Sequence, residues 1–229
     1  MKTIGMIGGM SWESSVEYYR EINNGVKQQL GGLHSAKIIL HSVDFAPIEK
    51  LQHGGDWDGT AQILTEAAQS VEAGGADFFI ICTNTMHKVA ESVAGSVNIP
   101  LLHIADATAE ALRQDNIVKV GLLGTSFTME QSFYKGRLIN NHGIEVMVPE
   151  SQDRNIIHEV IFKELCLGQQ NPQSKKEYLR IVESLSGKGC EAVILGCTEI
   201  GMLIGQTDTD TPLYDTTKIH AAKAVEWAL

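Results

Sequence analysis

The sequence predicts an α/β protein made of two similar lobes, each a mainly parallel sheet flanked by helices. The chain has 229 residues, which is large for one compact domain and comfortable for two small lobes. Short apolar runs alternate with longer helical patterns, as they do in proteins whose parallel sheets are covered by helices on both faces. An internal repeat relates the two halves of the chain.

Apolar runs of three to six residues predict the strands. In chain order these runs are Thr3–Ile7, Lys37–Ser42, Asp77–Cys82, Pro100–His103, Lys119–Leu123, Glu145–Met147 and Ala192–Leu195. Helical patterns lie between them, most clearly over residues 58–75 and 174–190. The first of these patterns ends in glycine, a residue that commonly terminates helices.

Three segments recur in the same order at nearly constant spacing. The matching pairs are "IGMIGGMS" with "VGLLGTSF" 116 residues later, "GADFFIICTNT" with "GCEAVILGCTE" 114 residues later, and "IPLLHIADATAEA" with "TPLYDTTKIHAAK" 112 residues later. The repeat predicts two lobes related by a pseudo-twofold axis. We expect residues 1–98 to form the first lobe and residues 99–210 the second, with the segment 211–229 packing back on the first. Because ligands bind beyond the carboxyl ends of parallel strands, we expect the active site in the cleft between the lobes.

The repeat also selects a residue in the turn "CTNT". Superimposing the halves aligns Cys82 with Gly196 and Thr83 with Cys197. Side chains alternate along a strand, so Cys82 is expected to point to the opposite face from Thr83 and to be buried and inert. The sequence therefore predicts Thr83 and Cys197 as the pair that faces the site.

Composition excludes several classes of function. With 18 basic and 28 acidic residues the net charge is −10, which does not suit nucleic-acid binding. The sequence has no apolar run of the ~20 residues that a membrane span needs, and we expect no signal peptide, because its start shows no long apolar segment. Its four cysteines form no CxxC pair and no zinc spacing. We expect a cytoplasmic protein that binds a small molecule, not nucleic acid or a membrane.

Familiar cofactor motifs are also missing. The stretch "IGMIGG" is not a GxGxxG fingerprint, there is no P-loop, and no lysine is singled out for pyridoxal phosphate. We therefore expect neither a cofactor nor a metal.

Two proton-carrying groups on opposite walls of a site are the arrangement that inverts a carbon centre. The turns that carry Thr83 and Cys197 both lie where a strand passes into a helix. Backbone N–H groups gather at such turns and can hold a carboxylate.

The chain resembles the cofactor-independent aspartate/glutamate racemases over essentially its whole length, through "IGMIGGMS", "CTNTMH", "IPLLHIADAT", "VGLLGT" and "GCTEIG". The resemblance implies a racemase active on aspartate or glutamate, independent of pyridoxal phosphate, and a homodimer. "GCTEIG" matches the family pattern fully. Thr83 stands where the family usually has its first cysteine, as in a branch that acts on L-aspartate and L-glutamate with a threonine–cysteine pair.

The threonine makes the predicted reaction asymmetric. A hydroxyl is a far weaker acid than a thiol, so Thr83 can deliver a proton but is a poor base. The resemblance implies that Cys197 faces the α-proton of the L-enantiomer. We expect Cys197 to remove this proton and Thr83 to return one from the other side.

Other residues complete the predicted site. Asn84, Thr85 and Thr198 either bind the α-carboxylate and amine of the substrate or cap helices. Glu199 either orients Cys197 or caps its helix. The resemblance implicates Met10 in substrate contact, with Thr125 as the counterpart of that loop in the second half. His87 is expected to cap or pack beneath its turn.

Two positions depart from the family's pattern for a second carboxylate. Gln52 stands where aspartate racemases place an arginine, and Cys166 replaces a lysine of the family. Lys163 is adjacent but is not expected to compensate, so the reaction type is better supported than the acidic substrate. Alternatives are a related enzyme, such as a hydantoin racemase, a maleate isomerase or an arylmalonate decarboxylase, and a ligand-binding protein that has lost catalysis.

Overall fold

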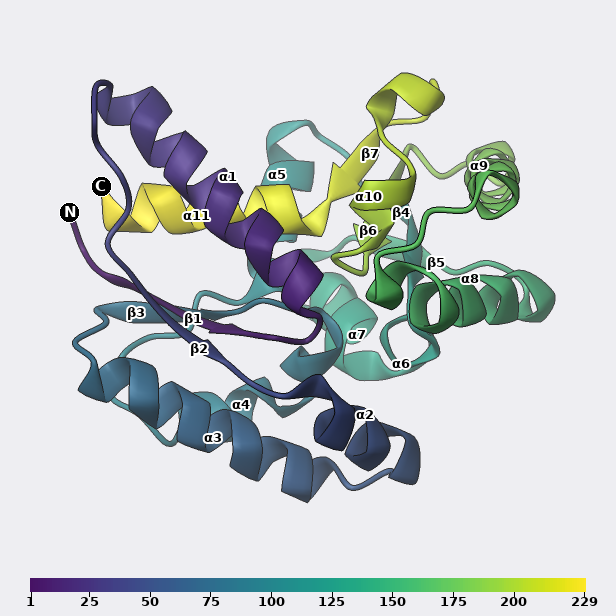
Figure 1. Cartoon of the computed structure of the whole chain (residues 1–229). Coiled ribbons are helices and arrows are strands. Elements are labelled where there is room, and N and C mark those ends of the chain that lie inside the picture. Colours follow the sequence, from purple (N-terminus) through teal and green to yellow (C-terminus); the bar gives the residue numbers. More distant parts are fainter. The chain divides into compact units, whose positions relative to one another are not determined.

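The computed structural model describes residues 1–229, which form two compact units. Unit 1 contains Met1–Ile104 and His220–Leu229, and unit 2 contains Ala105–Ile219 (Figure 1). Each unit is built on one parallel sheet with flanking helices, so the predicted two-lobed α/β class is confirmed. No helix has the length and apolar character needed to cross a bilayer.

Unit 1 carries a three-stranded sheet in the order β2-β1-β3. Its strands are β1 (Ile4–Gly8), β2 (Ile38–Ser42) and β3 (Phe78–Ile81). Its helices are α1 (Trp12–Leu30), α2 (Phe45–Gly54), α3 (Trp57–Ala73), the 3-10 helix η1 (Thr85–Val89) and α4 (Ala90–Ala94). Helices α1 and α11 (Thr216–Ala228) cover one face of the sheet, and α3 and α4 cover the other (Figure 1).

Unit 2 carries a four-stranded sheet in the order β5-β4-β6-β7. Its strands are β4 (Lys119–Gly124), β5 (Glu145–Met147), β6 (Ala192–Gly196) and β7 (Leu213–Asp215). Its helices, beginning at the boundary with unit 1, are α5 (Ile104–Gln114), α6 (Ser126–Glu130), α7 (Ser132–His142), α8 (Ser151–Lys163), η2 (Leu165–Leu167), α9 (Pro172–Gly187), α10 (Ile200–Leu203) and η3 (Gln206–Asp208). Residues of α8 and α9 form an apolar core against β4 and β6.

The internal repeat is visible in the register of the two sheets. Ile4 pairs with Phe78 in unit 1, and their repeat equivalents Val120 and Ala192 pair in unit 2. The N–H of Phe79 donates to the Pro100 carbonyl at 3.0 Å, and the equivalent Val193 N–H donates to Pro212 at 2.8 Å. The two halves of the chain therefore fold with the same strand pairing.

Two equivalent glycines show that helix packing repeats as well. A Cβ on Gly5 would lie 2.9 Å from the Cγ2 atom of Val71 on α3. A Cβ on Gly121 would lie 2.7 Å from the Cδ1 atom of Leu185 on α9. Glycine is needed at both positions because a helix side chain packs directly onto the strand backbone.

The last strand of each half differs from expectation. Residues 100–103 do not form a strand and contribute only a parallel bridge between Leu101 and Phe79, after which the chain enters α5. The equivalent segment of unit 2, Leu213–Asp215, was not predicted as a strand but forms β7 beside β6. This pairing keeps residues 211–219 in unit 2, and His220–Leu229 form the part of the predicted segment that belongs to unit 1.

A buried histidine ties α11 to the rest of unit 1. His220 Nε2 lies 2.9 Å from the Leu102 carbonyl, to which it must donate, so Nδ1 accepts from the Tyr18 hydroxyl at 2.9 Å. Burial lowers the pKa of His220 to about 4. This neutral tautomer is compatible with both hydrogen bonds.

The depressed pKa of His220 predicts acid sensitivity. An unfolded histidine binds its proton near pH ~6.5, so between that pH and about 4 the unfolded state binds more protons than the folded state. The free energy of unfolding should therefore fall as the pH is lowered through this window, by up to on the order of 3 kcal/mol from His220. Urea titrations of wild type and of His220→Gln, whose amide cannot titrate, check this. Parallel pH profiles for the two proteins would contradict it.

Candidate active site

Thr83 lies at the carboxyl edge of the first sheet, two residues beyond the Ile81 position that pairs with Ile7. Its side chain is buried apart from an exposed fraction of 9%. The hydroxyl makes no hydrogen bond to another protein group, and the only hydrogen bond shown for this residue is accepted by its carbonyl oxygen. Thr83 therefore presents a hydroxyl that no neighbouring base activates.

His87 holds the turn that carries Thr83. Its Nε2 accepts from the Ile104 N–H at 3.3 Å, so the ring proton is on Nδ1, which donates to the Thr83 carbonyl at 2.8 Å. The His103 ring packs edge-on against His87, with centroids 4.4 Å apart. The prediction that His87 lies beneath this turn is confirmed, and its role is to fix the backbone of Thr83.

Cys82 is buried in the core of unit 1. It belongs to the same apolar cluster as Phe78 and Ile80, whereas Phe79 and Ile81 belong to the cluster on the other face of the sheet. Burial raises the pKa of the Cys82 thiol, which therefore stays protonated. The expectation that Cys82 is buried is confirmed, and its raised pKa is in line with an inert thiol.

Cys197 occupies in unit 2 the position that Thr83 occupies in unit 1. It lies two residues beyond Leu195, which pairs with Leu123 as Ile81 pairs with Ile7. Its exposed fraction is also 9%. The predicted alignment of Thr83 with Cys197 is thus reproduced by the register of the strands that precede them.

Glu199 binds both residues that precede it. Its Oε2 accepts hydrogen bonds from Cys197 Sγ at 2.9 Å and from Thr198 Oγ1 at 2.8 Å. Although Glu199 occupies the N-cap position of α10, its side chain makes no capping hydrogen bond. Of the two predicted roles, the geometry matches orientation of the Cys197 thiol and not helix capping.

The surroundings of Cys197 favour its neutral form. Burial raises the pKa of this thiol well above its ordinary value, and the negative charge of Glu199, the nearby Cys166 and the hydrogen bond to Glu199 raise it further. The resting group is therefore a thiol that donates to a carboxylate. Thiol and carboxylate are in direct hydrogen-bond contact at 2.9 Å.

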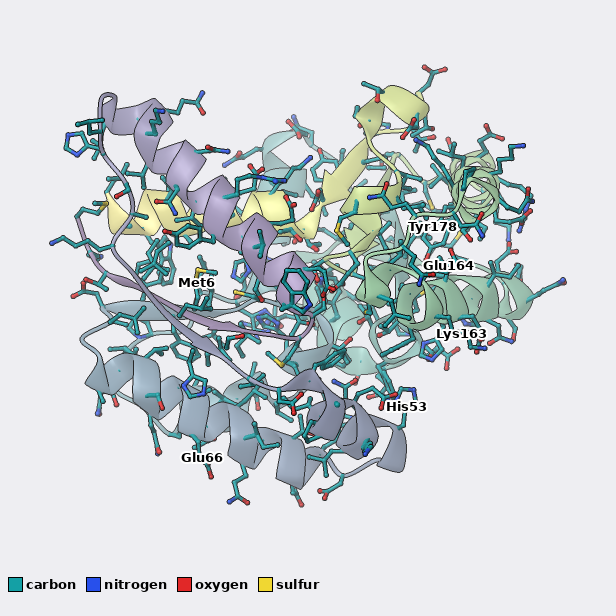
Figure 2. The ribbon with its side chains drawn as sticks, viewed as in Figure 1. Met6, His53, Glu66, Lys163, Glu164 and Tyr178 are labelled. Carbon is teal, nitrogen blue, oxygen red and sulfur yellow. The ribbon has the colours of Figure 1, made fainter.

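Two residues lie near Cys197: Tyr178, which the sequence did not single out, and Cys166, which it did. Tyr178 was missed, because it lies in a helical apolar pattern that predicts only core packing; its hydroxyl donates to the Ile157 carbonyl at 3.0 Å. Burial is the main cause that raises the pKa of Tyr178, and the nearby Cys197, Glu164 and Cys166 raise it further. Figure 2 labels Tyr178 and Glu164. Cys166, half-buried on η2, packs against the core cluster that contains Cys197 and Tyr178.

The other predicted residues of unit 1 also lie at the carboxyl edge of its sheet. Met10 follows β1, is 3% exposed, and shares an apolar cluster with Met86 of η1. Gln52 on α2 is 3% exposed, and its Nε2 donates to Met86 Sδ at 3.7 Å. Asn84 is buried and makes no capping hydrogen bond, although it stands at the N-cap of η1. Thr85 is the first residue of that helix and is also buried.

In unit 2 the predicted residues gather at the ends of β4 and β6. Thr125 follows β4 and caps α6, with its Oγ1 accepting from the Thr128 N–H at 3.3 Å. An added Cβ at Gly124 would lie 2.8 Å from the Gly196 carbonyl, so the turns that carry Thr125 and Cys197 are adjacent. Lys163 is exposed on α8 and forms an ion pair with Glu159 one turn earlier, in line with the expectation that it does not compensate for Cys166 (Figure 2).

Known proteins share the family and the fold of this chain. The family model described as Asp/Glu/hydantoin racemase matches residues 7–224. The structure is similar to that of a candidate Asp/Glu racemase from Yersinia pestis, with 53% identity, a TM-score of 0.92, and coverage of 100% of this chain and 99% of that one. It is also similar to an aspartate racemase homologue from Pyrococcus horikoshii, with 34% identity, a TM-score of 0.84 and the same coverage.

A more distant relative is the broad specificity amino-acid racemase RacX of Bacillus subtilis, 22% identical over 172 residues that cover 74% of this chain and 73% of that protein. The family match spans nearly the whole chain, including both strand-end turns. This chain belongs to the Asp/Glu/hydantoin racemase family.

Proposed function

We propose that this protein is a cofactor-independent amino-acid racemase that inverts the α-carbon of L-aspartate or L-glutamate. In this proposal Cys197 removes the α-proton and Thr83 delivers a proton to the opposite face of the carbon. Family membership supports the reaction class. The equivalent positions of Thr83 and Cys197 after equivalent strands support the choice of these two groups.

The observation that carries the proposal is the hydrogen bond from Cys197 Sγ to Glu199 Oε2 at 2.9 Å. When substrate binds, Glu199 accepts the thiol proton and leaves a thiolate. The thiolate takes the α-proton, and the electron pair stays on the α-carbon and its carboxylate. Thr83 Oγ1 then gives a proton to the carbon, and its alkoxide recovers one from water. Glu199 then releases the thiol proton to water, which balances the proton that Thr83 took from water. All three groups return to their resting forms, and the only net change is inversion at the α-carbon.

The remaining residues hold the substrate. Asn84, Thr85 and Thr198 are small polar groups at strand ends, suited to the α-carboxylate and the amine. Met10, Gln52 and Thr125 contact the remainder of the substrate, and pyridoxal phosphate takes no part. We also propose that the protein is cytoplasmic and works as a homodimer.

Glu199→Gln separates two effects of the carboxylate: that it accepts the thiol proton, and that its charge raises the pKa of Cys197. We expect kcat to fall about 10²-fold, because the amide cannot accept and keep the thiol proton. At the same time the pKa of Cys197 should fall, since the negative charge that raises it is lost. The rate of Cys197 alkylation by iodoacetamide against pH, followed by mass spectrometry, measures that pKa. Loss of activity with an unchanged or higher pKa would contradict the assigned role.

The experiment that tests the function is proton NMR of L- and D-amino acids, and of a 5-substituted hydantoin, in deuterated buffer with this protein. Loss of the α-hydrogen signal together with appearance of the other enantiomer supports a racemase. Exchange confined to a hydantoin would instead favour that branch of the family. Binding of amino acids without any exchange would show a ligand-binding protein that has lost catalysis.

A further inference from the structure

Gln52 carries a buried oxygen that the protein leaves without a partner. The side chain is 3% exposed, and its Oε1 atom has no hydrogen-bond partner in the structure. A buried carbonyl oxygen that accepts no hydrogen bond destabilises the folded protein, so its presence calls for an explanation, such as a ligand that donates to it. A group that donates to it on binding would remove this cost.

The orientation of the Gln52 amide follows from its other contact. Nε2 lies 3.7 Å from Met86 Sδ, and a thioether sulfur can only accept a hydrogen bond. The NH₂ group must therefore point to Met86 and Oε1 away from it. The opposite assignment would place two acceptors together and bury two unpaired N–H groups.

The position of Gln52 links it to the proposed site. Met86 is the residue after Thr85, on the same turn as Thr83 and Asn84. Met10, Ile48 and Met86 share one apolar cluster, so α2 packs against the ends of both β1 and β3. Gln52 thus belongs to the group of side chains around the turn that is proposed to bind substrate.

The distribution of buried charged side chains also favours an uncharged group beside Gln52. No lysine or arginine is buried, and Glu199 is the one buried residue among the aspartates and glutamates. Lys88, the cation nearest to the turn in sequence, lies over the Trp57 ring at 3.8 Å. A second substrate carboxylate beside Gln52 would therefore find no buried lysine or arginine of unit 1 to pair with it.

From these observations we infer that Gln52 Oε1 accepts a hydrogen bond from the side chain of the substrate. The enzyme would then prefer amino acids whose side chain ends in an uncharged donor, namely the carboxamides asparagine and glutamine. Aspartate and glutamate match these amides in size and remain substrates. Their side-chain carboxylate oxygens, however, can only accept hydrogen bonds, and so can Gln52 Oε1. This inference rests on the proposed racemase reaction and extends its substrates from aspartate and glutamate to their amides, which it makes the preferred ones.

The test compares substrates of equal length. Initial rates of α-hydrogen exchange in deuterated buffer are measured for L-asparagine against L-aspartate and for L-glutamine against L-glutamate. We expect kcat/KM to be at least about tenfold higher for each amide, because only the amide satisfies the buried oxygen. Gln52→Met removes the acceptor at similar volume and should lower the amide-to-acid ratio about tenfold through loss of the amide rate.

Two further variants keep the result interpretable. Gln62→Met makes the same change on the exposed face of α3 and should leave the ratio unchanged. Gln52→Glu keeps an accepting oxygen at the same size, so it should retain exchange of the amides and lose exchange of the acids. This variant serves even where Gln52→Met does not fold.

The outcomes distinguish failure of the role of Gln52 from failure of the proposed racemase function. Equal or faster exchange of the acids in wild type, or a ratio that Gln52→Met leaves unchanged, would overturn the role of Gln52 and leave the racemase intact. Exchange of other amino acids but of none of these four would overturn the inference and the proposed aspartate or glutamate substrate, and would leave only the racemase reaction. Absence of exchange with every amino acid would overturn the proposed function and this inference with it.

Discussion

Cys197→Ala should abolish both α-hydrogen exchange and racemisation while the protein stays folded. Proton removal in the proposed reaction depends on this thiol, and Thr83 cannot replace it because an unassisted hydroxyl is almost never ionised at neutral pH. We expect kcat to fall by at least about 10³-fold. Cys197 is buried in the core of unit 2, so loss of its sulfur should lower the free energy of unfolding by only about 1 kcal/mol and leave the protein folded. Exchange is measured by proton NMR and folding by thermal denaturation.

Cys82→Ala is the matched control, because Cys82 lies directly beside Thr83 in sequence but is buried in the apolar core. We expect it to lose about 1 kcal/mol of stability through a small cavity and to keep its catalytic rate within a few fold. Full activity of Cys197→Ala together with inactivity of Cys82→Ala would show that the wrong cysteine has been assigned.

L-substrates should lose their α-hydrogen to solvent faster than they racemise. Cys197 removes the proton from the L-enantiomer and can return deuterium to the same face, whereas inversion must wait for the weakly acidic hydroxyl of Thr83. For D-substrates the two rates should be closer, because a proton must first leave towards Thr83. Enantiomers have equal free energy, so kcat/KM is the same in both directions and the asymmetry must lie in kcat and KM separately.

Thr83→Cys tests the cause of this asymmetry. A thiol at position 83 can act as both acid and base, so the variant should speed turnover of D-substrates and bring the exchange and racemisation rates of L-substrates together. Thr83→Val, which has a similar shape and no hydroxyl, should keep exchange of L-substrates and lose racemisation. Equal exchange and racemisation rates for L-substrates in wild type would count against an asymmetric pair.

Much of the fold could be predicted from local patterns. The cores of β1, β3, β4 and β6 lie where apolar runs predicted them, because parallel strands buried on both faces show continuous apolar sequence. The edge strands β2 and β5 also lie on predicted runs, although they are partly exposed. The repeat in turn predicted the alignment of Thr83 with Cys197, which the strand register reproduces. Strand β7 was missed, although its repeat partner, Pro100–His103, had been proposed as a strand.

The amino-acid sequence by itself determined the two-lobed α/β class, the family and the two strand-end turns. Each of these depends on short apolar runs, short motifs or the repetition of such segments. Tertiary structure alone decided that Cys197 donates to Glu199, that His87 fixes the turn of Thr83, and that the oxygen of Gln52 is buried without a partner. These features depend on burial and on distances between side chains. No residue's type or spacing encodes them, since they arise only when strands and helices pack together.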